Sequence, residues 1–305
     1  MRFKLDDIEA FIAVMETGSF SAAGLRLDLS KSVISKRVSD LETVLGVRLL
    51  NRSTRGAHLT EVGQEFYQRA RDIMQQLKDA VESATEDKGR LCGQLRIAAP
   101  MSFGTMHLGN LLYRFLQDHP ELELLLSLDD RKTDIEASGV DLGIRITQMK
   151  DSTLIARKLG MSHRIVCCSP GYAEAYGLPH GIDGLAGHRC IGYSNVYSGQ
   201  LWQFEPVAGS GQPRAIPVKA SLIFNNGECM RDAAIAGLGL TLLPLFIVAD
   251  ALREGRLINA MPGDTPTPDT IYAMYPRRRY QPRKVRAVVE YLEASFARRL
   301  PWESE

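Results

Sequence analysis

Hydrophobic residues near the amino terminus recur at helical spacing. The first run, with apolar positions three or four residues apart, contains Leu5, Ile8, Phe11, Ile12 and Met15. This period predicts an amphipathic helix, and Gly18 predicts its end. Ser19 is placed as the N-cap of a second, short helix, and Ser30 as the N-cap of a third that runs to about Leu45. The region is therefore predicted to hold three helices.

The third predicted helix has two different sides. Its apolar side forms a narrow stripe at Ile34, Val38, Leu41 and Leu45. Its polar side and flanks carry small hydroxyls and basic residues, namely Lys31, Ser32, Ser35, Lys36, Arg37 and Ser39. After the stop at Gly46, residues 47–60 predict two short strands joined by a turn at 53–56. Helices followed by a hairpin are typical of a winged helix-turn-helix, in which the second helix of the pair enters the major groove of DNA.

Positive charge is concentrated in this segment. Residues 31–58 contain six basic and two acidic side chains, a local charge of +4, although the whole chain carries only +1. The near-zero total excludes nucleic-acid binding through net charge alone. A local basic patch on a helix and hairpin favours binding to a polyanion, because neutralised phosphates release counterions. The alternative is an ordinary solvated basic face.

A longer helix is predicted from residue 60 to about 87. Its apolar residues alternate at four and three positions, as Phe66, Ala70, Ile73, Leu77, Ala80 and Ala84. This is the seam of a coiled coil of a little under three heptads. The seam can pack onto its own domain or pair with a second copy of the chain. Residues 86–94, charged and glycine-containing, predict a hinge.

From residue 95 onward the pattern alternates between strands and helices. Strands are predicted at 95–98, 122–128, 141–146, 164–168, 218–224, 240–244 and 270–275, with helices between most of them and at the end. The alternation predicts a mainly parallel sheet with crossover helices. Roughly 210 residues exceed one small sheet, so the proline- and glycine-rich stretch 255–269 is interpreted as a return crossing between two lobes.

Residues 19–63 carry several motifs in a fixed order. They are the paired alanines at 22–23, the serine before the third helix, Leu-Glu at 41–42, Leu-Gly-Val-Arg-Leu at 45–49, Arg-Ser-Thr-Arg at 52–55 and Leu-Thr-Glu-Val-Gly at 59–63. This stretch resembles the DNA-binding signature of LysR-type transcriptional regulators. The resemblance covers the whole chain and implies an antiparallel dimerisation helix and an effector domain similar to periplasmic solute-binding proteins.

The fold expected from this resemblance is α/β with an N-terminal all-α winged helix-turn-helix, a long linker helix and a two-lobed periplasmic-binding-protein-like effector domain. The expected DNA-binding domain is 1–59, the linker or dimerisation helix 60–88 and the effector domain 89–305. Lobe I takes about 93–163 and 268–305, and lobe II takes about 164–267. DNA contacts are expected from Ser21, Lys31, Ser32, Ser35, Lys36, Arg37, Arg52 and Arg55. Dimer contacts are expected from Phe66, Ala70, Ile73 and Leu77.

A ligand in such a fold is expected between the lobes, where the carboxyl ends of strands meet. Ser102 matches the family's effector-contacting hydroxyl, although it could instead be the N-cap of a helix beginning at Gly104. Asn225 and Asn226 open a helix and either contact the ligand or cap that helix. Further effector candidates are Phe103, Asp129, Arg145, Thr147 and Tyr193. A helix amino terminus facing amide donors favours a small organic anion.

Neither a membrane protein nor an exported one is expected. The longest uncharged stretch, 233–249, has 17 residues and contains Pro244, whereas a membrane span needs about 20 apolar residues. Acidic residues at 6, 7 and 9 interrupt any signal peptide. We therefore expect a cytoplasmic protein whose partners are operator DNA, a small-molecule effector, further copies of itself in a dimer or tetramer, and RNA polymerase.

The chemistry of a metalloprotein or an enzyme is missing from the sequence. The five cysteines are odd in number and lack metal-ligand spacing, so no metal and no cofactor are expected. The G-x-S-x-G, G-x-x-x-x-G-K and H-E-x-x-H motifs do not occur. An enzyme or a solute receptor built on the two lobes is the weaker alternative. A redox-sensing regulator that uses Cys190 and Cys229 is the other one.

Overall fold

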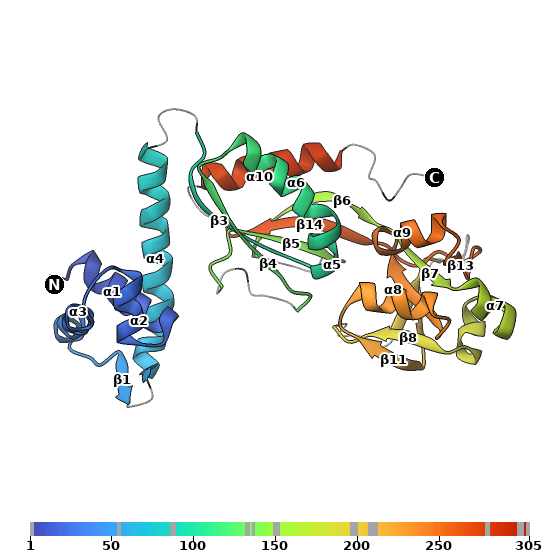
Figure 1. Cartoon of the computed structure of the whole chain (residues 1–305), viewed down its shortest axis with the longest axis horizontal. Helices are drawn as coiled ribbons and strands as arrows, with labels where there is room; N and C mark the ends of the chain where they lie inside the picture. Colours follow the sequence, from blue (N-terminus) through green and yellow to red (C-terminus); the bar gives the residue numbers. More distant parts are fainter. Residues whose placement is uncertain are drawn as a thin grey trace. The chain divides into compact units, whose positions relative to one another are not determined.

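The chain divides into two compact units, Met1–Lys88 and Gly89–Glu305, which are described separately (Figure 1). The computed structural model describes residues 3–53, 56–85, 90–131, 135, 138–148, 153–195, 201–206, 213–277, 281–297 and 302. The first unit is helical with one hairpin, and the second is α/β with two five-stranded sheets. This is the predicted fold class.

The first unit is a three-helix core with a small wing. Its elements are α1 (Leu5–Thr17), α2 (Phe20–Arg26), α3 (Lys31–Leu45), β1 (Leu50–Ser53), β2 (Gly56–Leu59) and α4 (Glu61–Thr85). The predicted caps are confirmed, because the Ser19 hydroxyl accepts from the Ala22 amide at 3.1 Å and the Ser30 hydroxyl accepts from the Val33 amide at 3.3 Å. Gly18 and Gly46 end α1 and α3 in the left-handed conformation.

The wing is held against the helices by its backbone. The Glu42 carboxylate on α3 accepts hydrogen bonds from the Leu49 and Leu50 amides at 2.8 and 3.0 Å. At the start of α4, a Cβ on Gly63 would lie 2.1 Å from the carbonyl oxygen of Leu49. A side chain there is sterically forbidden. The glycine of the Leu-Thr-Glu-Val-Gly motif is therefore needed for α4 to lie this close to the wing.

The apolar stripe of α4 changes its surroundings along the helix. Phe66 packs against Phe11 with ring centroids 5.7 Å apart, and Ala70 is 4% exposed in the core of the same unit. Further along the helix, Ile73 is 58% exposed and Leu77 is 38% exposed. The amino-terminal half of the predicted dimer seam is thus intramolecular core, which corrects that assignment for Phe66 and Ala70. Dimerisation through the exposed half of the stripe, at Ile73 and Leu77, remains a prediction.

The second unit contains two mixed sheets. In the first, the strand order is β4-β3-β5-β14-β6, with β3 at Gly93–Ala99, β4 at Leu122–Leu128, β5 at Leu142–Thr147, β6 at Ile155–Ser162 and β14 at Asp269–Tyr275. One continuous helical stretch follows β3, made of α5 (Met101–Phe103), a π-helical turn (Gly104–Leu108) and α6 (Gly109–Asp118). Helices α6 and α10 (Arg283–Phe296) lie together on this sheet (Figure 1).

The second sheet has the order β11-β8-β12-β7-β13. These strands are β7 (Arg164–Cys168), β8 (Cys190–Tyr193), β11 (Ala220–Phe224), β12 (Leu240–Pro244) and β13 (Ile258–Asn259). Its helices are α7 (Pro170–Tyr176), a 3-10 helix (Ile182–Gly187), α8 (Gly227–Ile235) and α9 (Leu245–Arg253), and a separate hairpin pairs β9 (Leu201–Phe204) with β10 (Arg214–Pro217). We call the first sheet with its helices lobe I and the second lobe II.

The prediction of a mainly parallel sheet is wrong for the strands that cross between lobes. Strand β14 runs antiparallel to both β5 and β6, and β7 runs antiparallel to β12 and β13. Strand β6 runs toward lobe II and leads into it at His163, whereas β14 runs back from lobe II. In lobe I, β14 therefore points in the direction opposite to β5 and β6. Arg164 and Asp269, at the two crossings, form an ion pair at 3.6 Å.

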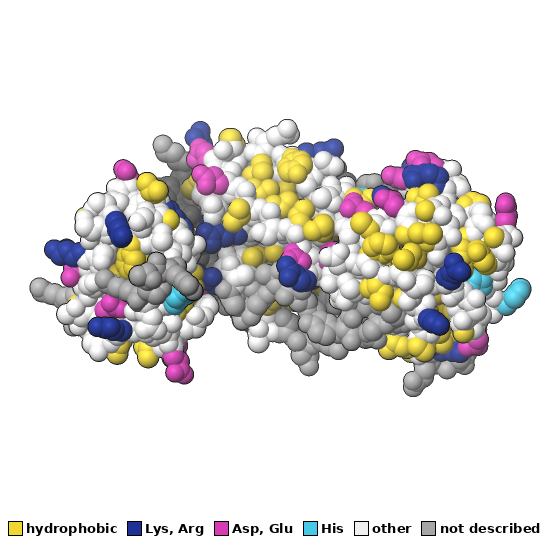
Figure 2. Space-filling model, turned by 60° about the horizontal axis from the view of Figure 1, so that its bottom comes forward, with side chains coloured by type: hydrophobic (Ala, Val, Ile, Leu, Met, Phe, Trp, Pro, Cys, Tyr) yellow, Lys and Arg dark blue, Asp and Glu magenta, His cyan; other side chains and the backbone are white. Residues whose placement is uncertain are grey.

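The surface mixes side chains of all kinds. On the face shown in Figure 2, acidic, basic and hydrophobic side chains are interspersed, and hydrophobic ones gather in several places on the second unit. Within the described ranges, no single helix has the length and apolar composition to span a membrane. One bent pair of helices, Leu5–Thr17 with Phe20–Leu27, passes that test by length and composition, and its residues Phe11 and Ala23 are fully buried in the core of the first unit.

Candidate functional site

The polar face of α3 is open to solvent. Lys31, Ser32 and Lys36 are exposed and Ser35 is half-buried, whereas Ile34 on the opposite side is fully buried. The Ser30 and Ser32 hydroxyls lie 2.8 Å apart at the start of the helix. The predicted DNA-reading side chains therefore share one accessible surface at the amino-terminal half of α3, as a recognition helix requires.

The other expected DNA contacts have different surroundings. Arg37 is half-buried and donates to the Asp6 carboxylate on α1 at 3.0 Å, so its guanidinium already has an intramolecular partner. Ser21 is exposed on α2. The side chain of Arg52 and all of Arg55 lie outside the described residues, and their role in the wing stays a prediction.

In the second unit, the carboxyl ends of the parallel strands point toward the junction of the two lobes. Strands β3 and β4 run parallel in lobe I, as do β8 and β11 in lobe II. Contacts between the lobes form here: the Asn226 side-chain amide donates to the Met101 sulfur at 3.6 Å, and the Gln148 amide donates to the Gln203 oxygen at 3.3 Å. The effector candidates can now be placed against this junction.

Ser102 is the buried hydroxyl of this junction. It is 5% exposed, and its Oγ has no hydrogen-bond partner among the described residues. It faces the first turn of α8 across the junction, because a Cβ on Gly227 would lie 3.7 Å from this Oγ. A buried hydroxyl without a partner is rare in a folded protein. Its orientation toward a helix amino terminus is suited to an anion that both could bind.

The alternative role of Ser102 as a helix cap is wrong. The helix begins at Met101, with Pro100 in the N-cap position, and not at Gly104. The acceptor for the Met101 amide is the Asp130 carboxylate, at 2.7 Å. Ser102 lies inside the first turn of this helix, one residue after Met101.

Phe103 is buried in the packing between the lobes and has no surface open to a ligand. Its ring is fully buried and packs against Phe246 and Phe296, with centroids 5.3 and 5.9 Å away. The expectation that it lines the cleft is wrong because the residue after Ser102 turns into the core, about 100° around the helix.

The two asparagines differ in role. Asn226 is the N-cap of α8, with its Oδ1 accepting from the Cys229 amide at 2.9 Å while its Nδ2 reaches Met101 of lobe I. Asn225 is exposed, and its carbonyl oxygen accepts from the Asn195 amide at 3.4 Å. Capping is therefore part of Asn226's role, and both residues border the junction.

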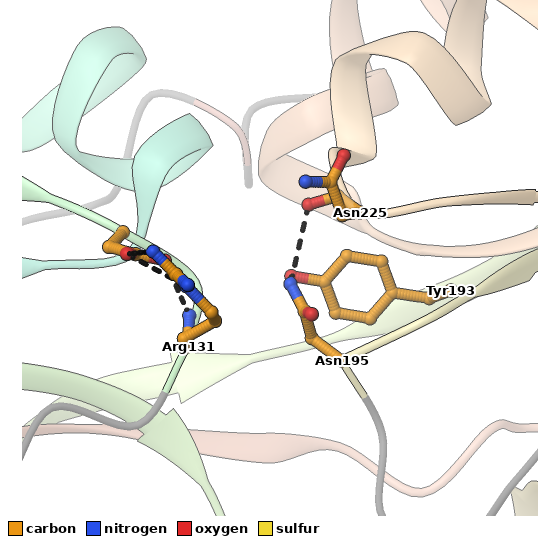
Figure 3. A network of polar contacts seen from close by, with 5 residues as sticks. Arg131, Tyr193, Asn195 and Asn225 are labelled. Atoms are coloured by element: carbon orange, nitrogen blue, oxygen red, sulfur yellow. Dashed lines mark hydrogen bonds and ion pairs between the residues drawn. The ribbon is translucent and has the colours of Figure 1, made fainter.

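Tyr193 ends β8 and faces lobe I. The Asn195 amide donates to its phenol oxygen at 3.4 Å (Figure 3). Burial raises the pKa of the Tyr193 phenol, and the carboxylates of Asp130 and Asp129 in lobe I raise it further. The phenol is therefore neutral and interacts with the acidic residues that follow β4.

The remaining candidates are spread over lobe I. Asp129 forms an ion pair with Arg131 at 2.9 Å, whose hydrogen bonds hold the pKa of that carboxyl low. Arg145 lies half-buried on β5 opposite Tyr272 of β14, and burial lowers its pKa. The Thr147 hydroxyl donates to the Gln148 carbonyl at 3.2 Å, beside the contact with Gln203. Sequence reasoning missed Asp130, which directly follows the candidate Asp129, and Asn195, which lies two residues after the candidate Tyr193.

The two cysteines of the redox alternative, Cys190 and Cys229, lie in different surroundings. Cys190 is fully buried on β8, and burial raises the pKa of its thiol to about 11. Cys229 is exposed on α8. Because the thiolate is the reactive form, burial of Cys190 disfavours the redox alternative. Among the described residues, no cluster of His, Cys, Asp and Glu has the arrangement of a metal site.

Comparison with known proteins covers both units. Residues 5–64 match the family described as bacterial regulatory helix-turn-helix protein, lysR family, and residues 88–297 match the LysR substrate binding domain. An uncharacterized HTH-type transcriptional regulator of Haemophilus influenzae is 35% identical over 285 residues, 93% of this chain and 98% of that protein. The HTH-type transcriptional regulator PtxR of Pseudomonas aeruginosa is 33% identical over 96% of this chain and 93% of that protein.

A solved structure agrees over the whole chain. The full-length virulence activator AphB of Vibrio cholerae, a member of the LTTR protein family, is 27% identical, covers 96% of this chain and 99% of its own, and superposes with a TM-score of 0.63. The winged helix-turn-helix and the two-lobed domain thus occur together in these proteins, in this order. The chain belongs to the LysR-type family of bacterial transcriptional regulators, proteins that bind operator DNA and small-molecule effectors and that form oligomers.

Proposed function

We propose that the protein reads its operator through the exposed face of α3 and is controlled by a small carboxylate-bearing effector held between lobes I and II. The observation that carries the proposal is the buried Ser102 hydroxyl, which has no partner among the described residues and faces the first turn of α8. An effector changes regulation only if it binds two assemblies of the protein with different affinity. Because a bacterium transcribes its genes in the cytoplasm, we propose that the protein acts there.

Ser102→Ala tests the effector site. The variant should lose the response to effector and keep operator affinity, because Ser102 and α3 lie in different compact units. A hydrogen bond to a charged ligand contributes about 1.5–3 kcal/mol, roughly ten- to hundredfold in Kd. Calorimetry against acidic, neutral and cationic metabolites measures this loss. Undiminished binding of the effector in Ser102→Ala would show that Ser102 does not contact it.

Lys36→Ala tests the recognition face. Lys36 is exposed at the middle of the polar side of α3, so its removal should weaken specific binding by about 1–3 kcal/mol without unfolding the unit. The measurement is a fluorescence titration with DNA upstream of the protein's own gene and with random DNA, at several salt concentrations. Lys219→Ala, exposed in the other unit, is the control. Equal weakening on both DNAs would make Lys36 a phosphate contact instead of a base contact.

Two exposed apolar surfaces support the dimer and the tetramer that we propose for this protein. The exposed Ile73 and Leu77 on α4 can pair two chains. In lobe I, β4 is an edge strand with Leu125 50% exposed, and the neighbouring α6 presents Tyr113 at 57% exposure. A second, independent apolar surface is what a dimer needs to form a tetramer. Contact with RNA polymerase is the remaining partner that we propose for a regulator of this kind.

A further inference from the structure

Two adjacent carboxylates lie at the carboxyl end of β4, next to the junction of the lobes. Asp129 is held by Arg131 through its side chain at 2.9 Å, and Asp130 accepts the Met101 amide at 2.7 Å. Among the described residues at this end of β4, one guanidinium lies beside two carboxylates, which together carry a charge of −1. This part of the junction therefore repels an effector that is only an anion and attracts a positive group.

The opposite side of the same space is formed by lobe II. The carboxylates of Asp130 and Asp129 raise the pKa of the Tyr193 phenol from across the junction, and the Asn195 amide donates to the phenol oxygen at 3.4 Å. Figure 3 shows Arg131 of lobe I on one side and Tyr193, Asn195 and Asn225 of lobe II on the other, with the Tyr193 phenol oxygen directed toward the side of lobe I. The acidic groups and the phenol thus meet between the lobes, where they can accept hydrogen bonds from a ligand cation.

Hydrogen-bond donors lie next to these acceptors. The Ser102 hydroxyl and the first turn of α8 are the groups suited to a carboxylate, and Ser102 directly follows Met101, whose amide Asp130 accepts. The Asn226 side-chain amide lies beside them and donates a hydrogen bond to the Met101 sulfur at 3.6 Å. The residue that offers the donor hydroxyl, Ser102, is thus adjacent in the chain to Met101, whose amide Asp130 accepts, which fits a small ligand whose two opposite charges are separated by one carbon atom.

A helix cap alone does not account for this arrangement. Asn or Ser would accept the Met101 amide as well as Asp130 does, and a cap needs neither a second carboxylate beside it nor a phenol from the other lobe. Capping does not explain why Asp130 also raises the pKa of the Tyr193 phenol from across the junction.

We propose that the effector is a zwitterion, an amino acid whose carboxylate is bound by Ser102 and the first turn of α8 and whose ammonium group lies between Asp130, Asp129 and the Tyr193 phenol. This inference rests on the proposed function, and it names the effector class. Asp130 is then the residue that selects amino acids over acids with the same carbon skeleton.

Calorimetry with the full chain tests the proposal on three matched sets of acids: propionate, lactate and alanine; succinate, malate and aspartate; glutarate, 2-hydroxyglutarate and glutamate. In at least one set, the amino acid should bind at least tenfold more tightly than its hydroxy and unsubstituted counterparts. Asp130→Asn keeps an acceptor for the Met101 amide, so it should fold, and it should reduce this preference at least tenfold. Asp183→Asn, whose partner is Arg214 at the surface of lobe II, should leave the preference unchanged.

The outcomes separate this proposal from the one on which it rests. If no amino acid binds, or if an unsubstituted acid binds as tightly as its amino acid, the zwitterion is overturned while the effector site itself can stand. If the preference for the amino acid is unchanged in Asp130→Asn, the role of Asp130 is also overturned, independently of the result for Ser102→Ala. Undiminished binding of all ligands in Ser102→Ala counts instead against the site of the proposed function.

Discussion

Ile73→Lys is expected to convert the dimer into folded monomers that bind the operator much more weakly. Ile73 is 58% exposed on α4, and Leu77, one turn later on the same face, is 38% exposed. Burying an apolar side chain of this size contributes about 1.5–3 kcal/mol, and a two-fold dimer loses it twice, about 3–6 kcal/mol in all. Sedimentation velocity gives the oligomeric state, and titration with operator DNA gives the affinity.

The control must add the same charge to the same helix without touching the stripe. Gln64→Lys does so, because Gln64 is exposed half a turn away from Ile73 around α4. Circular dichroism should show the native helix content in both variants, since neither position lies in the core of the unit. An intact dimer in Ile73→Lys, with unchanged operator affinity, would place the interface elsewhere.

The first unit was predictable because its signals are local. Ser19, Ser30 and Gly46 define the ends of helices through hydrogen bonds and backbone conformations within a few residues of themselves. The family motif adds contacts that periodicity does not contain, such as the approach of Gly63 to Leu49. Periodicity did not reveal that the stripe of α4 has two surroundings, the core of its own unit at Phe66 and solvent at Ile73. Both residues fit the same period.

The second unit was less predictable where strands cross between lobes. Strand β6 (Ile155–Ser162) was missed since its exposed and buried positions do not alternate regularly. Its antiparallel pairing with β14 joins segments more than 100 residues apart, which no local pattern encodes. Strands such as β4 and β7, which are rich in apolar β-forming residues, were predicted with the observed bounds.

The candidate effector site shows the same division. Ser102 was found from its place after a strand, but its neighbour Phe103 was wrongly included, since the side-chain direction at the start of a helix depends on where that helix begins. Asp130 was missed because only the folded chain brings its carboxylate to the Met101 amide and to Tyr193. Sequence positions gave the neighbourhood of the site, and tertiary contacts decide which side chains belong to it.

Trp302 packs where the two lobes meet the end of the chain. Its ring is 5% exposed and lies 4.3 Å from His107 and 6.1 Å from Phe103 of lobe I, and 5.8 Å from Phe246 of lobe II. The His107 ring nitrogen is also 3.1 Å from the Phe246 carbonyl oxygen. The indole therefore fills the space between helices of both lobes.

Trp302→Ala should accordingly destabilise the second unit by about 3–5 kcal/mol, because a large cavity would remain at a junction that close packing cannot refill. Urea unfolding followed by circular dichroism should show the transition of the second unit at lower urea and the transition of the first unit unchanged, since the two are separate compact units. Leu238→Ala, at a side chain that is 49% exposed, should shift neither transition by more than about 0.5 kcal/mol. A Trp302→Ala protein as stable as the wild type would mean that the lobes are held together without the indole.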